Sequence, residues 1–175
     1  MRLLFGYMYA HPSKKLLFMG SELAQRDEFW EEGSVDWSLE KSPLHRGVQR
    51  LITDLNHLHT SEPALFEVDF EWSGFEWIDA NDALNSILSW VRRAKNPEEF
   101  VIVVCNFTPV VREEYRVGVP RAGFYREILN TDSNFYEGTD VGNAGGVSAE
   151  PIPWNNRPYS IKLRLPALAV MYFKP

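Results

Sequence analysis

After Pro63 the sequence consists of short apolar and β-branched runs separated by turn-forming residues, and this pattern constrains the fold most. Runs of this length at hairpin spacing are typical of antiparallel β-strands. They cover residues 75–78, 86–91, 100–107, 115–119, 125–129, 159–165 and 167–173. Together they predict an antiparallel β-sandwich. Residues 133–158, rich in glycine and proline, are too irregular for a strand pair and are expected to form an extended surface loop.

Before residue 62 the apolar spacing is mainly helical. One stripe recurs at i, i+4, i+7, i+8, i+11 and i+14, and its members are Leu44, Val48, Leu51, Ile52, Leu55 and Leu58. Ser42 as N-cap and Pro43 at the first helical position mark the start of this helix, and Pro63 follows its end. Burial of such a stripe contributes on the order of 10 kcal/mol, so the helix needs an apolar surface to pack on.

A second helix is expected at Arg2–Ala10, and a short apolar run at residues 16–19 lies between the two helices. The run is continuous and stops at Gly20, as expected for a parallel strand buried on both faces. Helices flank such strands, so the first part of the chain has a predicted αβα order. A long loop connects Gly20 to Ser42, and loops of that length in compact domains are usually functional.

Composition excludes several classes of protein. The 175 residues are 45% hydrophobic and 14% aromatic, which suits a folded chain, yet a complete (β/α)8 barrel of about 250 residues does not fit. With 24 acidic and 18 basic residues the formal charge is −6, so nucleic acid is not an expected partner. No apolar run approaches the ~18–20 residues that cross a bilayer, so no membrane contact is expected.

The first ten residues superficially resemble a signal peptide. However, His11 and Pro12 follow without a small-x-small cleavage site, so the segment is interpreted as mature sequence. The single cysteine, Cys105, lies in an apolar run and is expected to be a small buried hydrophobe, with a reactive thiol as the alternative. One cysteine permits no internal disulfide, which fits a reducing compartment.

The common motifs for metal, phosphate and nucleophile sites are missing from the sequence. His57 and His59 point about 200° apart on a helix, so they are expected to be solvated surface residues and not metal ligands. A Gly-x-Ser-x-Gly elbow and a phosphate loop are absent. Neither a metal ion nor a cofactor is therefore expected. Carboxylates are numerous, but the sequence does not fix the separation of any acid and nucleophile pair.

The loop after Gly20 interleaves aromatic and polar side chains, including Glu22, Trp30, Asp36 and Trp37. An indole stacks on the apolar face of a sugar ring, while the hydroxyls of the sugar need donors and acceptors. The loop thus suits a carbohydrate surface. The alternative is that its tryptophans only anchor it to the domain.

Short motifs along nearly the whole chain resemble one protein family. In the first part they are Lys14-Lys15-Leu16-Leu17-Phe18-Met19-Gly20-Ser21-Glu22-Leu23-Ala24-Gln25, Asp36-Trp37-Ser38-Leu39, His45-Arg46-Gly47-Val48-Gln49-Arg50-Leu51 and Asp54-Leu55-Asn56. Later motifs include Gly74-Phe75-Glu76-Trp77-Ile78, Cys105-Asn106-Phe107-Thr108-Pro109 and Arg126-Glu127-Ile128-Leu129-Asn130-Thr131-Asp132. In this number and order they resemble the C-terminal portion of bacterial 1,4-α-glucan (glycogen) branching enzymes of the α-amylase superfamily.

The resemblance implies the end of a catalytic (β/α)8 barrel followed by an all-β C-terminal domain. It identifies Arg2–Ala10 with the end of helix seven, residues 16–19 with strand eight and residues 44–59 with helix eight. The expected fold class is mostly β: an antiparallel sandwich preceded by an αβα remnant of the barrel. Residues 1–62 would be the incomplete barrel end, and residues 63–175 the all-β domain.

The family's reaction cleaves an α-1,4 bond and transfers the segment to a 6-hydroxyl, which forms an α-1,6 branch. Its three catalytic carboxylates follow barrel strands four, five and seven, so the resemblance assigns no catalytic residue here and implies that the chain is inactive alone. Glu22, Trp30, Asp36 and Trp37 follow strand eight on the active-site face and are the implied substrate-binding residues. Residues 153–157 depart from the family, whose members often have a His-Gly pair there.

The implied partners are an α-glucan, such as glycogen or starch, and the rest of the barrel, in a cytoplasmic enzyme. A lone strand eight exposes apolar surface, so self-association is possible and residues 1–40 are expected to be mobile, self-associated or rearranged. Two alternatives remain open: a non-catalytic α-glucan-binding sandwich module, and the C-terminal part of another α-amylase-superfamily enzyme.

Overall fold

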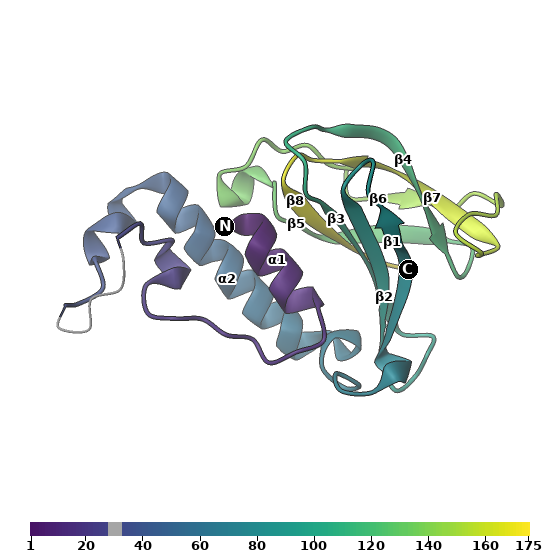
Figure 1. Ribbon diagram of the computed structural model, residues 1–175, viewed down its shortest axis with the longest axis horizontal. Helices are drawn as coiled ribbons and strands as arrows, with labels where there is room; N and C mark the ends of the chain where they lie inside the picture. The colour runs from purple at the N-terminus through teal and green to yellow at the C-terminus, as the bar shows by residue number, and fades with distance from the viewer. Residues whose placement is uncertain (28–32) are drawn as a thin grey trace.

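The computed structural model describes residues 1–27 and 33–175. Two antiparallel sheets pack face to face, and two helices cover the outer face of the larger sheet. Figure 1 shows both helices on one side of that sheet and the smaller sheet on the other. The mostly β, antiparallel fold predicted from the sequence is confirmed.

The larger sheet has the strand order β1-β2-β3-β8-β5-β6, and β4 pairs with β7 in the smaller one. The strands are β1 Phe75–Asp82, β2 Ile87–Arg93, β3 Phe100–Asn106, β4 Arg112–Val119, β5 Phe124–Asn130, β6 Gly146–Ser148, β7 Tyr159–Leu165 and β8 Ala169–Lys174. Each of the seven runs identified in the sequence corresponds to one strand. The additional strand, β6, lies inside the segment expected to be a loop.

The sandwich core lies between the two sheets. Alternate residues of β3 point into it, including Ile102 and Val104, and they meet Ile161 and Leu163 of β7. The intervening residues of β3, among them Val103, point to the helical side instead. The centre of the larger sheet is therefore buried on both faces, which explains why β3 is apolar from Phe100 to Cys105.

Helix α1 (Arg2–Ala10) and helix α2 (Pro43–Ser61) pack on the outer face of the sheet in a second core. The apolar stripe of α2 supplies Leu51 and Leu55, both fully buried, as the sequence predicts. Tyr172 of β8 donates a hydrogen bond of 2.6 Å to the carbonyl oxygen of Gly6 in α1. These contacts fix the helices to the sheet.

Arg92 of β2 is fully buried at the junction between the helices and the sheet. Its guanidinium donates to the carbonyl oxygen of Ala10 at 2.7 Å and to Asp69 Oδ1 at 2.7 Å. It also donates to the carbonyl oxygens of Leu65 at 3.2 Å and Gly74 at 3.3 Å. One side chain thus connects the end of α1, the segment after α2 and the beginning of β1.

Two further details differ from the sequence-based expectation. Within the described residues, positions 16–19 form no strand; Leu16 is 78% exposed, because a parallel strand exists only beside hydrogen-bonding neighbours. His59 is also not simply solvated, since it is half-buried and its ring meets Tyr9 edge-on at 6.2 Å. Desolvation lowers the pKa of His59.

Candidate functional site

The loop after Gly20 begins with a tight turn that the sequence prescribes. Gly20 has φ of +82°, a backbone conformation that favours glycine, and it precedes the short 3-10 helix η1 (Ser21–Leu23). Leu23 is buried, and its carbonyl oxygen accepts a 2.6 Å hydrogen bond from His45 Nδ1 at the start of α2. This first part of the loop is therefore held against α2.

The second part of the loop forms the 3-10 helix η2 (Trp37–Lys41), which Asp36 caps. Asp36 Oδ1 accepts a 2.9 Å hydrogen bond from the backbone N–H of Ser38, and hydrogen bonding by Ser38 lowers the pKa of this carboxyl. The backbone N–H of Asp36 donates to Gln25 Oε1 at 3.2 Å, which joins the two parts of the loop. An ionised carboxylate thus lies next to Trp37, whose side chain is 60% exposed.

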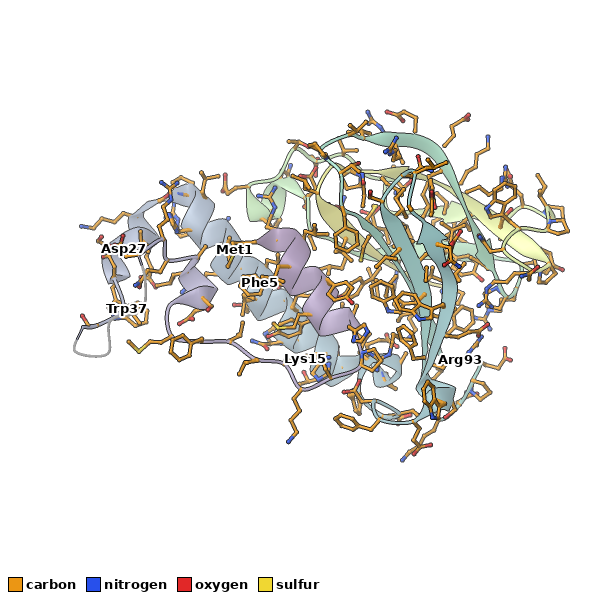
Figure 2. All side chains as sticks on the ribbon, in the orientation of Figure 1. Met1, Phe5, Lys15, Asp27, Trp37 and Arg93 are labelled. Atoms are coloured by element: carbon orange, nitrogen blue, oxygen red, sulfur yellow. The ribbon has the colours of Figure 1, made fainter. Side chains whose placement is uncertain are left out.

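The four sequence-predicted substrate-binding residues have different positions. Asp36 and Trp37 are exposed neighbours on the second part of the loop, and Glu22 lies half-buried on η1. Trp30 lies outside the described residues. Figure 2 places Trp37 and Asp27 together at the end of the molecule remote from Arg93.

A groove of about 620 Å³ lies beside this loop, between the beginnings of α1 and α2. Gln25 and Arg26 of the loop line it together with Leu3, Leu44 and Val48. Glu22, Asp36 and Trp37, the predicted substrate-binding residues that the structure describes, do not line this groove. Sequence reasoning placed Gln25 and Arg26 in the loop but did not single them out.

A second groove, of about 850 Å³, opens between β1 and β4 on the sandwich. Trp154, Tyr115, Asp79 and Asp82 are among its lining residues. The sequence signal for it was Trp154, in the short stretch that departs from the family pattern. Its remaining members come from strands far apart in sequence, so spacing did not reveal it.

The titratable groups of the described residues provide no metal centre, since no group of three or more His, Cys, Asp or Glu residues is suitably placed. Cys105 is fully buried, and desolvation raises the pKa of its thiol well above its ordinary value. The thiol therefore stays protonated, as the buried-hydrophobe interpretation requires. No helix within the described chain is long and apolar enough to cross a membrane.

The architecture defines the class of protein: an all-β antiparallel sandwich whose larger sheet carries two helices. Residues 77–175 match the family described as "Alpha amylase, C-terminal all-beta domain". The chain belongs to this family.

Over nearly its whole length the chain is also similar to curated branching enzymes. It is 53% identical over 174 residues to the 1,4-alpha-glucan branching enzyme GlgB of Aquifex aeolicus, covering 99% of this chain and 28% of that protein. It is 53% identical over 176 residues to the enzyme of the same name from Rubrobacter xylanophilus, covering 100% of this chain and 24% of that protein. The chain thus spans about a quarter of the length of these relatives.

Solved structures share the fold over 99% of the chain. An alpha-amylase from H. orenii gives a TM-score of 0.57 at 14% identity, with 34% of that chain covered. A MutB mutant in complex with sucrose gives 0.56 at 12% identity, with 37% covered. At these identities the likeness concerns the fold alone, and it includes the helical part as well as the sandwich.

Proposed function

We propose that this chain is the C-terminal portion of a 1,4-α-glucan branching enzyme, which cleaves α-1,4 bonds and transfers the released segment to a 6-hydroxyl as an α-1,6 branch. The observation that carries this proposal is identity of about one half to branching enzymes along essentially the whole chain. The catalytic carboxylates would lie upstream, in the larger part of the relatives that this chain does not cover. The enzyme would be cytoplasmic.

Within such an enzyme the chain would complete and stabilise the barrel. Residues 1–62 would form the end of the catalytic barrel, and residues 63–175 would form the all-β domain. Apolar side chains exposed on the helical side support this division, because Leu4, Leu16 and Met19 each expose about half or more of their surface. Apolar surface of this kind marks a protein interface.

Residues 16–19 fit the same role. They belong to no strand of the described structure, and beside neighbouring barrel strands they would form the eighth strand. The buried Arg92 would then couple this barrel end to the sandwich. In the isolated chain, the same surface would favour self-association.

The loop residues Glu22, Trp30, Asp36 and Trp37 would bind the glucan at the rim of the barrel. The exposed Trp37 ring offers a face for a pyranose, and the ionised Asp36 carboxylate next to it accepts hydrogen bonds from hydroxyls. Neither group performs the bond cleavage in this proposal. They orient the glucan for carboxylates elsewhere in the enzyme.

A chimera tests the proposal directly. The chain replaces the matching 174 residues of the Aquifex aeolicus enzyme, and α-1,6 linkages formed from amylose are counted after debranching. We expect branching by the chimera and none by the 175-residue chain alone. Branching by the isolated chain, or a folded but inactive chimera, would contradict the proposal.

Two leucines give a matched control for the barrel interface. Leu16 is 78% exposed on the helical side, and Leu84 is 97% exposed on the turn between β1 and β2. In the chimera, Leu16→Asp should sharply reduce branching while Leu84→Asp leaves it unchanged. In the isolated chain, Leu16→Asp should reduce self-association measured by sedimentation velocity, with no loss of folding.

A further inference from the structure

The groove between β1 and β4 lies at the open edge of the sandwich, away from the helices. β1 is an edge strand of the larger sheet, and β4 is paired only with β7 in the described structure. Both helices pack on the opposite face of the larger sheet (Figure 1). A partner covering the helical side would therefore leave this groove open to solvent.

Trp154 is held at the rim of the groove by a rigid turn. The backbone of Trp154 and Arg157 closes the turn with hydrogen bonds of 3.0 and 2.9 Å, and Asn155 and Asn156 adopt φ of +47° and +58°. Asn155 Oδ1 accepts a 3.0 Å hydrogen bond from the backbone N–H of Gly118 on β4. A Cβ at position 118 would lie 2.1 Å from the Trp154 carbonyl oxygen, so only glycine permits this approach. The backbone of Trp154 is consequently fixed before any ligand arrives, and 48% of the residue is exposed.

The polar side chains of the groove are fixed as well. Tyr115 donates a 2.7 Å hydrogen bond to Asp82 Oδ2, and Asn85 Nδ2 donates to both oxygens of Asp82 at 2.9 Å. Burial alone would raise the pKa of Asp82, but these hydrogen bonds outweigh it and the pKa is lowered. Asn155 Nδ2 also donates to Asp79 Oδ2 at 3.3 Å. The groove thus presents carboxylates whose orientation is set by neighbouring donors.

The charge of the lining residues decides which ligand fits. The groove contains four carboxylates, from Asp79, Asp82, Glu113 and Glu114, and two guanidinium groups, from Arg112 and Arg116. This acidic balance disfavours phosphates and other anions. No three of the metal-ligating side chains that the structure describes are grouped for a cation. An exposed indole on a fixed backbone, beside oriented carboxylates and amides, instead suits a neutral ligand with many hydroxyls.

We propose that this groove is a second carbohydrate-binding site, in which a gluco-oligosaccharide stacks on Trp154 and its hydroxyls bond to Asp79, Asp82 and Asn81. The α-linkage of the oligosaccharide rests on the proposed function, whereas the site itself rests on the groove. A site here holds a glucan chain on the sandwich, remote from the loop that carries Trp37. In the parent enzyme it would retain the polymer between transfers.

The test is a titration of the 175-residue chain with maltoheptaose, in which binding is measured by calorimetry and by tryptophan fluorescence. We expect saturable binding that Trp154→Ala weakens by at least about tenfold and Trp154→Phe weakens less, because a smaller ring still stacks. Trp72→Ala is the matched control. Trp72 is 97% exposed and lies outside the groove, so this variant should retain the affinity of the unmodified chain.

A second variant protects the test against a folding defect in Trp154→Ala. Asn81 is exposed in the groove, and Asn81→Ala preserves the backbone N–H that donates to Asp79. This variant should also weaken maltoheptaose binding. No saturable binding, or binding unaffected by either substitution, would overturn the proposed site. Loss of binding in Trp37→Ala alone would overturn it too, while leaving the loop as a glucan site.

The chimera experiment and the maltoheptaose titration test separate proposals, so either proposal can fail without the other. An inactive chimera combined with Trp154-dependent maltoheptaose binding would refute the branching-enzyme assignment and keep the groove. An active chimera, combined with maltoheptaose binding that Trp154→Ala does not weaken, would refute the groove site and keep the branching-enzyme assignment.

Discussion

Apolar side chains are buried in the sandwich but largely exposed at Leu16, in the segment between the two helices. Leu163 in β7 is 1% exposed between two sheets, whereas Leu16 in the connecting segment is 78% exposed. The sandwich completes its core with residues of this chain alone. In the connecting segment, Leu17 packs only partly against the helical core, and Leu16 lies mostly in solvent.

This difference shows that apolar sequence leads to burial only where a partner layer exists. The strands of the sandwich acquire partners from hairpins and from β8, which inserts between β3 and β5. Residues 16–19 would need parallel neighbours, and the helices beside them already face the sheet. The hydrogen bond of Arg92 to the carbonyl oxygen of Ala10 joins the sandwich to the end of α1, where the connecting segment begins.

The largest expected effect is from Arg92→Ala. Arg92 is fully buried. Removing its guanidinium leaves Asp69 Oδ1 and the carbonyl oxygen of Ala10 without the 2.7 Å hydrogen bonds that it donates to them. Breaking a buried, hydrogen-bonded ion pair costs about 3–5 kcal/mol. Urea denaturation should therefore show a loss of that order in the free energy of unfolding.

Arg93→Ala is the matched control, one residue along the same strand. Arg93 is half-buried and pairs with Glu76 at 2.8 Å near the surface. Such pairs contribute about 0–1 kcal/mol. Equal losses for the two variants would mean that the junction does not depend on the buried guanidinium.

The sequence predicts the elements well where the pattern is local. The bounds of α1 are reproduced, and α2 begins at Pro43 after Ser42 as the capping pattern indicates. The sequence pattern does not predict β6, because this strand begins at Gly146 and its three residues are too few to show a periodicity. It does not distinguish Arg92 from Arg93, because β2 is covered on both faces and its alternation is lost.

The candidate sites depend on long-range contacts, which the sequence pattern does not contain. Loop composition was enough to identify Asp36 and Trp37 as a polar and aromatic pair, and their role in glucan binding stays a prediction. The groove on the sandwich brings Asp82, Tyr115 and Trp154 together from three separate segments. They lie side by side only because the larger sheet, which contains β1, packs against the smaller sheet, which contains β4.

The contrast between the two leucines can be measured next. Leu163→Ala removes a fully buried side chain from the sandwich core and should cost about 2–5 kcal/mol. Leu16→Ala should cost less than about 0.5 kcal/mol in the isolated chain, since most of its surface is already in water. Thermal or urea unfolding of both variants gives the comparison. A large loss for Leu16→Ala would show that the connecting segment is already part of a closed core.

The smallest expected effect is a pH dependence from Lys15, at the junction of the connecting segment and the helical core. Its Nζ donates a 2.8 Å hydrogen bond to the carbonyl oxygen of His11, and desolvation lowers the pKa of Lys15 to about 8. Between pH 8 and the unfolded pKa near 10.5, the unfolded chain then binds more protons than the folded chain. The contribution of Lys15 to stability should consequently rise with pH from about 8 to about 9.5. It is read as the difference between the unmodified chain and Lys15→Met, because the raised pKa of the buried Cys105 thiol gives an opposite slope in both.

Because Lys15 remains partly exposed, solvent screening limits this gain to about 1 kcal/mol or less. Lys15→Met should remove the rise between these pH values and stabilise the chain slightly at pH 7, as urea midpoints would show. Lys14→Met, at the exposed neighbouring position, should leave the pH profile unchanged. If Lys15→Met kept the rise, the ammonium group would not be desolvated by the helical core. The connecting segment would then be more loosely attached than its contacts with His11 indicate.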